Sequence, residues 1–151
     1  MTTEETIEKM MLLKLTHMAH AYRELLASAP GNALSVEEHI GLLIDREWTE
    51  RENARTGRRI RDAKLGMQAC LEDVWCDVGR GIDKATVRSF ATCQWVRAKQ
   101  NVIAIGATGT GKSYLGAALA EAACRRGFRA LRVRLPRLLG VRAIARADGT
   151  Y

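Results

Sequence analysis

Apolar residues recur at steps of three and four along the first part of the chain. The stripe consists of Ile7, Met11, Leu15, Met18, Tyr22 and Leu25. This spacing predicts one α-helix, which the sequence Ala29-Pro30-Gly31 ends. A second helix is predicted from Ser35, which forms a Ser-x-x-Glu capping box with Glu38, to about Lys64. Its expected buried face consists of Val36, Ile40, Leu43 and Ile44.

The pattern changes after Lys64. Residues 65–82 follow neither a helical nor a strand period and contain three glycines, so we place the connection between two domains there. Asp83 is the expected N-cap of a helix that continues to about Ala98. The apolar residues of this helix are Val87, Phe90, Ala91 and Trp95.

Two short strands and two helices are predicted in the remainder. VIAI (102–105) is an apolar, β-branched run, and ALRVRL (130–135) alternates leucine or valine with arginine. A helix lies between them and ends at Arg125-Arg126-Gly127. Pro136 stops the second strand. A last short helix is predicted to hold Leu138, Leu139, Val141 and Ile144.

Composition and charge define the class of protein. Of 151 residues, 47% are hydrophobic and 27% charged, as in soluble globular proteins. No apolar run approaches the roughly 18–20 residues that a membrane helix needs, and the start MTTEETIEK does not resemble a secretory signal. We therefore expect a cytoplasmic protein without a membrane partner. The net charge of +7 favours acidic partners such as nucleic acid.

The cysteines and histidines indicate neither a metal site nor a disulfide. The cysteines contain no Cys-x-x-Cys pair, so we expect them to be reduced and buried. They are Cys70, Cys76, Cys93 and Cys124. His17 and His20 are three residues apart, but no acidic or thiol partner is near them in sequence. We interpret them as ordinary helix residues.

The octamer GATGTGKS (106–113) is the part of the sequence that predicts a ligand-binding site. It matches the phosphate-binding loop Gly-x4-Gly-Lys-Ser/Thr, with a predicted strand before it and an amphipathic helix after it. Its glycines let successive backbone N–H groups turn into one concavity at the positive end of the helix dipole. Lys112 is expected to reach the β- and γ-phosphates of a nucleotide and Ser113 to bind Mg²⁺. The predicted nucleotide-binding residues are Gly106, Ala107, Thr108, Gly109, Thr110, Gly111, Lys112 and Ser113.

Longer segments of the chain resemble a known family. They are LLIDREWTERENARTGRRIRDAKL (42–65), RGIDKATVRSFATCQWV (80–96), NVIAIGATGTGKSYLGAALAEAACRRGFR (101–129) and IARADGT (144–150). In these segments the chain resembles the IstB-like helper ATPases of bacterial insertion sequences, relatives of the DnaC helicase loader within the AAA+ class. The REW-x-x-REN segment and the loop with its ATCQW lead-in are the more specific parts.

The resemblance implies a fold and a set of partners. It implies an α/β protein with a helical N-terminal domain (1–64), the connection (65–82) and an incomplete Rossmann-like P-loop AAA+ core (83–151). The implied cofactors are ATP and Mg²⁺. The implied partners are duplex DNA, bound without sequence preference, and a transposase. A homo-oligomer is implied for the full-length protein.

The family also implies further residues. Its members continue with an apolar strand ending in two acidic residues, and the only acidic residues after Lys112 here are Glu121 and Asp148. We therefore expect a chain truncated before that strand, with no catalytic residue of its own. We expect it to bind ATP without appreciable turnover and to leave strands 102–105 and 130–135 with unpaired edges.

A basic segment is the candidate DNA contact, and it allows two interpretations. Its members are Arg55, Arg58, Arg59, Arg61 and Lys64. They could neutralise DNA phosphates, or they could form a solvated helix with ion pairs to Glu47, Glu50 and Glu52. The arginines after position 124 are expected to face other parts of the domain or a neighbouring subunit. Three functions stay open: a transposition helper, a helicase loader, and a remnant that only binds nucleotide.

Overall fold

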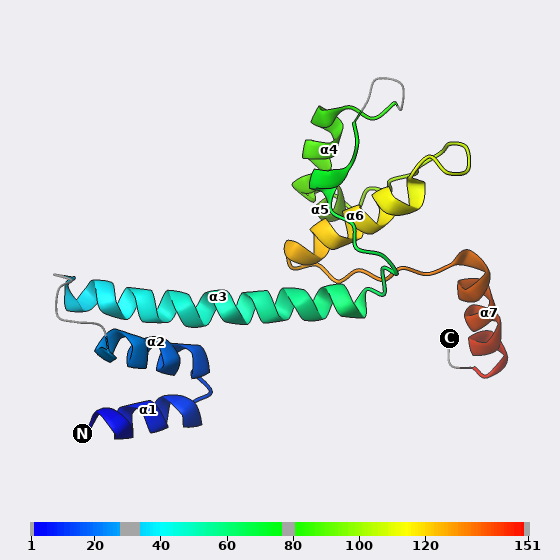
Figure 1. The fold of residues 1–151 in the computed structure, drawn as a ribbon. Helices are drawn as coiled ribbons and strands as arrows, with labels where there is room; N and C mark the ends of the chain where they lie inside the picture. The colour runs from blue at the N-terminus through cyan, green and yellow to red at the C-terminus, as the bar shows by residue number, and fades with distance from the viewer. Residues whose placement is uncertain (1, 28–33, 77–80, 150–151) are drawn as a thin grey trace. The chain divides into compact units, whose positions relative to one another are not determined.

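The computed structural model of the chain describes residues 2–27, 34–76 and 81–149. Within these residues it has seven α-helices, one 3₁₀ helix and no β-strand (Figure 1). None of the described helices has the length and apolar content needed to span a membrane. The helices are α1 (Thr3–Leu12), α2 (Thr16–Ala27), α3 (Val36–Asp62), η1 (Leu71–Asp73), α4 (Lys84–Ala91), α5 (Gln94–Arg97), α6 (Lys112–Arg125) and α7 (Leu135–Ala147). All regular secondary structure in the described residues is therefore helical, and the predicted α/β core is not seen among them.

The chain divides into two compact units, Met1–Arg55 and Thr56–Tyr151, with the division inside α3. The domain limits predicted at 64/65 and 82/83 stay a prediction. Leu65, Ala69 and Leu71, which fall in the predicted connection, nevertheless belong to the buried cluster of the second unit. Apolar residues without a regular period can still be core residues, because loops also pack.

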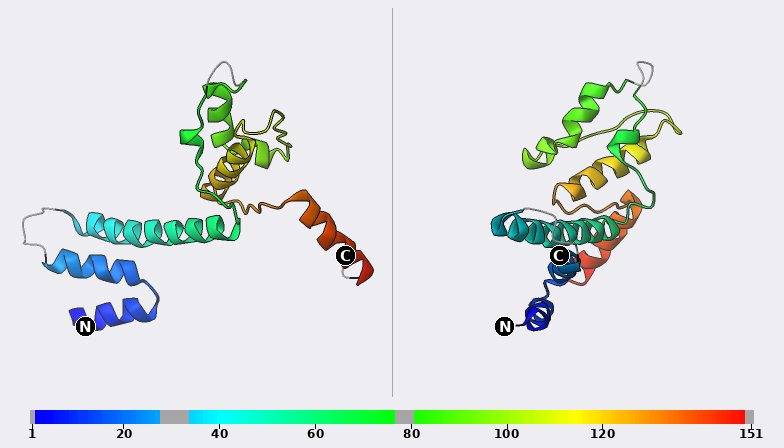
Figure 2. Two further views of the ribbon diagram at one scale, coloured as in Figure 1. Left: turned by 45° about the vertical axis from the view of Figure 1, so that its right-hand side comes forward. Right: turned by 60° about the vertical axis from the view of Figure 1, so that its left-hand side comes forward.

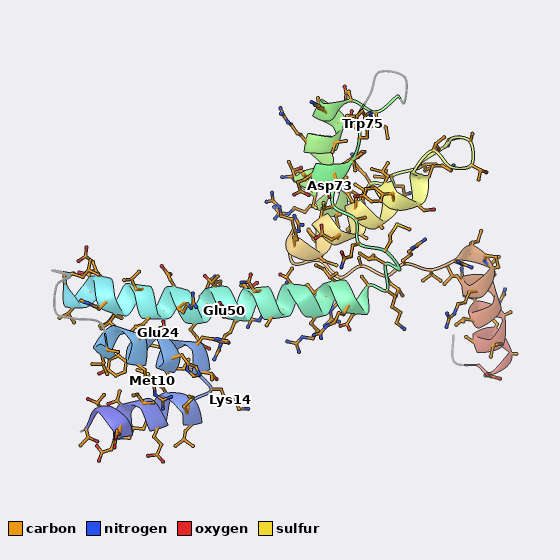
Figure 3. The ribbon with its side chains drawn as sticks, viewed as in Figure 1. Met10, Lys14, Glu24, Glu50, Asp73 and Trp75 are labelled. Atoms are coloured by element: carbon orange, nitrogen blue, oxygen red, sulfur yellow. The ribbon has the colours of Figure 1, made fainter. Side chains whose placement is uncertain are left out.

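In the first unit, the predicted helix over Ile7–Leu25 is wrong, because two helices occupy this range. α1 and α2 contact each other and are separated by a turn in which Lys14 has φ 59°. Figure 3 shows Lys14 at this turn. The Leu15 N–H donates to the Met10 carbonyl at 2.8 Å, which closes the turn. The periodic stripe remains buried or half-buried, since two packed short helices satisfy the same spacing. The stop predicted at 29–31 lies outside the described residues.

α3 begins as predicted. The Glu38 N–H donates to Ser35 Oγ at 3.2 Å, and the Ser35 N–H donates to Glu38 Oε2 at 2.7 Å, which is the expected capping box. Its predicted buried face is largely wrong, since Leu43 is buried whereas Val36, Ile40 and Ile44 are exposed. The helical period shows which apolar residues share one face of the helix. Which of them are buried depends on the position of the element that packs against that face.

The second unit is built around α6. Figure 2 shows α4 and α6 side by side, and both η1 and α4 contact α6. The buried residues of α6 are Leu115, Ala117, Ala118, Leu119, Ala123 and Cys124. Four of the six are alanine or cysteine, so backbones can approach closely here. The helix ends as predicted in a Schellman motif, in which Gly127 (φ 90°) and Phe128 donate to the carbonyls of Cys124 and Ala123.

The helix predicted over 83–98 is broken into α4 and α5. Asp83 is its N-cap as expected, with Oδ1 accepting the Thr86 N–H at 2.6 Å. The break occurs at Cys93, which is fully buried and has φ 55°. The left-handed conformation of a buried Cys93 depends on the residues packed around it, so the sequence near Cys93 does not predict this break in the helix.

The two segments predicted as strands form no ladder with any residue the structure describes. Ile103 and Ile105 are 80% and 92% exposed. A backbone hydrogen bond of 2.9 Å from Arg132 to the Ala63 carbonyl ties the second segment to the end of α3. A strand requires a paired neighbour, so the apolar pattern alone does not produce one. Leu135, assigned to the second strand, instead begins the predicted last helix, α7.

Candidate functional site

The loop 106–113 leads directly into α6. Gly111 is the N-cap of the helix and Lys112 its first residue. Gly109 and Gly111 have φ angles of 85° and 87°, a region that side chains other than glycine enter only with strain. The two predicted loop glycines therefore occupy positions where glycine is physically required.

Gly106 lies in tight contact with a side chain of the loop. A Cβ atom added there would lie 3.2 Å from Thr110 Oγ1, closer than an ordinary contact. Thr110 Oγ1 itself donates to the Ala107 carbonyl at 2.9 Å. The start of the loop thus leaves room for the Thr110 side chain to fold over it.

Lys112 points back across the loop. Its Nζ donates to the Ala107 carbonyl and lies 3.4 Å from Thr110 Oγ1. The ammonium therefore already sits over the loop, on the side of the helix N-terminus. Thr108 and Ser113 are exposed.

The loop offers donors to an anion. The backbone N–H groups of Gly111, Lys112 and Ser113 donate to no residue that the structure describes. They lie at the N-terminus of a helix of 14 residues, where the helix dipole favours negative charge. Three N–H groups, one ammonium and the Ser113 hydroxyl make a chemically suitable site for a polyphosphate with its Mg²⁺. The predicted roles of these residues remain predictions.

The basic segment at the end of α3 is only partly paired. Arg55 Nη1 donates to Glu52 Oε1 at 2.5 Å. Arg58, Arg59, Arg61 and Lys64 form no ion pair with a described residue, so the ion-paired interpretation holds for Arg55 alone and the DNA contact stays a prediction. Lys64 lies just beyond α3 with φ 51°.

Among the later arginines, Arg125 and Arg132 form hydrogen bonds within the second unit. Arg125 donates to Glu121 at 2.6 Å and to Glu72 at 2.9 Å. Burial lowers the pKa of Arg125, but the two carboxylates outweigh it and raise that pKa above its ordinary value. Arg132 Nη1 donates to the Leu65 carbonyl. These contacts hold η1 and the end of α3 to α6 and its following segment.

The cysteines and histidines form no metal site. No group of three or more His, Cys, Asp or Glu side chains that could hold an ion occurs in the described ranges. All four cysteines are free thiols in the structure. Cys93 and Cys124 are buried as predicted, whereas Cys70 and Cys76 are half-buried, so the prediction is wrong for these two. Burial raises the pKa of Cys93 and Cys124, which keeps these thiols protonated.

Sequence reasoning missed a buried carboxylate in the first unit. Glu47 is 6% exposed and accepts the Met18 N–H at 2.9 Å and Arg51 Nε at 2.6 Å. Arg51 Nη2 also donates to the Lys14 carbonyl at 2.5 Å. Both residues belong to the REW-x-x-REN segment. The signal that could have found them is this i, i+4 Glu–Arg pair on the same face as buried Leu43.

The chain matches a family model described as IstB-like ATP binding protein over residues 8–151. It is 38% identical over 152 residues to a Pseudomonas fluorescens protein named as an ATP-binding protein of insertion sequence IS1162. It is 39% identical over 151 residues to the insertion sequence ATP-binding protein y4pL of Sinorhizobium fredii. Both matches cover 100% of this chain, which spans 66% of the first relative and 62% of the second. A third relative, from insertion sequence IS21 of Pseudomonas aeruginosa, is 32% identical over 84% of this chain and 48% of its own length.

Proposed function

The chain belongs to the family of IstB-like ATP-binding proteins, and from this premise we propose that it binds Mg-ATP at residues 106–113 and serves as a DNA-binding helper of insertion-sequence transposition. The observation that carries the nucleotide part is the position of Lys112 Nζ. The side chain folds back over the loop to the Ala107 carbonyl, beside the N-terminus of α6. The names of the relatives support the transposition part. They favour it over a helicase loader, because each named relative is an insertion-sequence protein.

The proposed binding mode assigns each loop residue a task. The N–H groups of Gly111, Lys112 and Ser113 hold phosphate oxygens, and Lys112 Nζ binds the β- and γ-phosphates. The Ser113 hydroxyl is a ligand for Mg²⁺. We further propose that the non-helical segments 102–105 and 130–134 belong to an α/β P-loop core of the AAA+ class, since one enters the loop and the other follows α6, and that they become strands only beside a paired neighbour.

Nucleotide binding is tested by a charge deletion with a matched control. Lys112→Ala removes a charge-assisted contact and should weaken binding of fluorescent Mg-ATP roughly 10- to 150-fold. Lys84→Ala makes the same change at the first position of another helix, α4, and should leave the affinity unchanged. Equal affinities for Lys112→Ala and the unmodified chain would refute the proposed site.

The DNA contact is proposed for the unpaired end of α3. Arg58, Arg59 and Arg61 carry positive charge that no described carboxylate neutralises by an ion pair. Replacing all three with Ala should weaken binding to unrelated duplexes alike. It should also lower the slope of log affinity against log salt by up to about 2–3, because each lost phosphate contact contributes about 0.9.

Net charge must be separated from position in this test. A control that replaces Arg134, Arg137 and Arg146 with Ala makes the same change in charge on α7 and its N-cap. If the control lowers the slope as much as the α3 variant, the contact is not specific to α3. Transposase assistance is tested by capture, in which a transposase, and not a replicative helicase, should retain the chain.

A further inference from the structure

A lysine with an unusual backbone conformation follows the end of α3. The helix ends at Asp62, and Lys64 has φ 51°. Residues other than glycine enter this left-handed region only with strain, and glycine is the residue usually found there after a helix. Lys64 is exposed, whereas its neighbours Ala63 and Leu65 are 0% and 5% exposed. The strained residue is therefore an exposed cation between two residues of the core.

Arg132 binds the backbone on both sides of Lys64. Its backbone N–H donates to the Ala63 carbonyl at 2.9 Å, and its Nη1 donates to the Leu65 carbonyl. Figure 1 shows the segment between α6 and α7 passing the end of α3. A Cβ added at Gly66 would lie 3.0 Å from Arg132 Nη1, so the glycine leaves space for the guanidinium. One residue from a distant segment thus fixes the direction of the chain before and after Lys64.

Lys64 continues the basic segment at the end of α3. None of the cations of this segment after Arg55 forms an ion pair with a described residue; they are Arg58, Arg59, Arg61 and Lys64. The last carbonyls of a helix have no donor within the helix, so the end of α3 depends on donors from elsewhere for its order. A cation that is already held in one direction loses less conformational entropy when it meets a phosphate. Strain at Lys64 is therefore useful if this side chain binds an anion.

We propose that Arg132 is a positioning residue that holds Lys64 in its left-handed conformation, so that the Lys64 ammonium binds a DNA phosphate beside the arginines of the α3 end. This role rests on the proposed DNA contact and adds to it a residue from the segment after α6. It also gives a reason for a lysine at a position that suits glycine, because glycine fits the backbone but carries no charge.

Glycine variants of the whole chain separate DNA binding from stability. Lys64→Gly removes the strain and should unfold at an equal or higher urea concentration than the unmodified chain. It should nevertheless bind a fluorescent DNA duplex about five- to tenfold more weakly at about 0.1 M salt, because one phosphate contact is lost. Lys99→Gly makes the same change after α5, where φ is 55°, and should alter the DNA affinity by less than about twofold. The inference is overturned if Lys64→Gly binds DNA as well as the unmodified chain, or if both variants lose affinity equally.

A charge deletion at Arg132 tests the positioning role. Arg132→Met keeps the aliphatic stem and removes the guanidinium, and it should weaken DNA binding at least about threefold. In the free chain it should also lower the hydrogen-exchange protection of peptides within 56–66, while peptides from α6 keep theirs. Arg129→Met is the matched control, since Arg129 is exposed and forms no ion pair with a described residue. It should change neither measurement by more than about twofold. Unchanged protection of 56–66 in Arg132→Met would overturn the inference.

Dependence on Lys64 separates positioning from a direct contact between Arg132 and DNA. In a Lys64→Gly background, Arg132→Met should change the DNA affinity by less than about twofold, since no lysine remains to be held. If the threefold loss persists without Lys64, Arg132 binds phosphate itself and the inference is overturned. Failure of the unmodified chain to bind duplex DNA would instead refute the proposed DNA contact, and this inference with it.

Discussion

Removing the carboxylate of Glu47 should unfold the start of α2. The position before this helix is Leu15, whose carbonyl accepts the Ala19 N–H at 3.0 Å but whose side chain has no oxygen to cap the helix. Glu47, 29 positions after Met18 in the chain, supplies that acceptor to the Met18 N–H. A residue of α3 therefore does for α2 what a local N-cap normally does.

The magnitude follows from the bonds that are lost. Glu47→Ala removes an acceptor for one backbone N–H and breaks the 2.6 Å ion pair with Arg51. Because Arg51 is 44% exposed, water can rehydrate its charge, and the full penalty of an isolated buried ion does not apply. We expect a loss of about 2–3 kcal/mol in the stability of the first unit. Glu47→Gln keeps one acceptor for Met18 and should lose about 1–2 kcal/mol.

Hydrogen exchange read by mass spectrometry provides the assay, because it reports α2 separately from the second unit. Peptides within 16–27 should lose protection in Glu47→Ala, and peptides from α6 should not. Glu50→Gln is the matched control, since Glu50 lies on the same helix and forms no ion pair with a described residue (Figure 3). Unchanged protection of α2 in Glu47→Ala would refute the reasoning.

The same carboxylate predicts a dependence on pH. Burial raises the pKa of Glu47, but the Met18 N–H and Arg51 outweigh it and hold that pKa below its ordinary value of 4.5. A carboxyl whose pKa is depressed by folding adds stability above the unfolded-state pKa. That contribution is lost as pH falls through the lower native pKa. Protection of α2 should therefore fall below about pH 4.5, and by less in Glu47→Gln, which cannot titrate there.

Three further predictions concern α6 and the loop. Gly116→Ala, in the interior of α6 with open space around it, should stabilise the second unit by about 0.5–1 kcal/mol. Gly127→Ala should destabilise it by about 1 kcal/mol because Gly127 has φ 90°. Urea unfolding measures the direction of both changes in the free energy of unfolding. Gly111→Ala, at φ 87°, should weaken Mg-ATP binding while Gly116→Ala does not, as nucleotide titration would show. The expectation that residues 1–151 bind ATP without appreciable turnover is checked by phosphate release, and sustained release that disappears in Lys112→Ala would contradict it.

Local signals in the sequence predicted the parts of the fold that depend on local physics. The caps at Ser35 and Asp83, the end of α6 at Gly127 and the glycine loop all follow from residue types at fixed spacing. Each is satisfied within a few residues, so each is visible in the sequence alone.

The missed features depend on contacts between distant residues. The turns at Lys14 and Cys93 use positive φ angles at residues that carry no such preference. Glu47 lies in a heavily charged helix and looked like a surface residue, because its Met18 partner is 29 positions away. The strands predicted at 102–105 and 130–135 depend on neighbours that an apolar pattern does not specify. Within the site, the loop was predictable, whereas the shared Ala107 carbonyl was not.

The cap that Glu47 provides has a consequence for synthesis on the ribosome. A chain grows from its N-terminus at about 5–20 residues per second, so α2 emerges roughly 1.5–6 seconds before the residue that caps it. During that interval α1 and α2 pack against each other without α3, and the Met18 N–H lacks the acceptor that it has in the folded unit. The N-terminal helices therefore cannot complete their fold in the order in which they are made. Their native form depends on the emergence of α3, which sets the earliest point at which this unit is protected from proteases and from premature association.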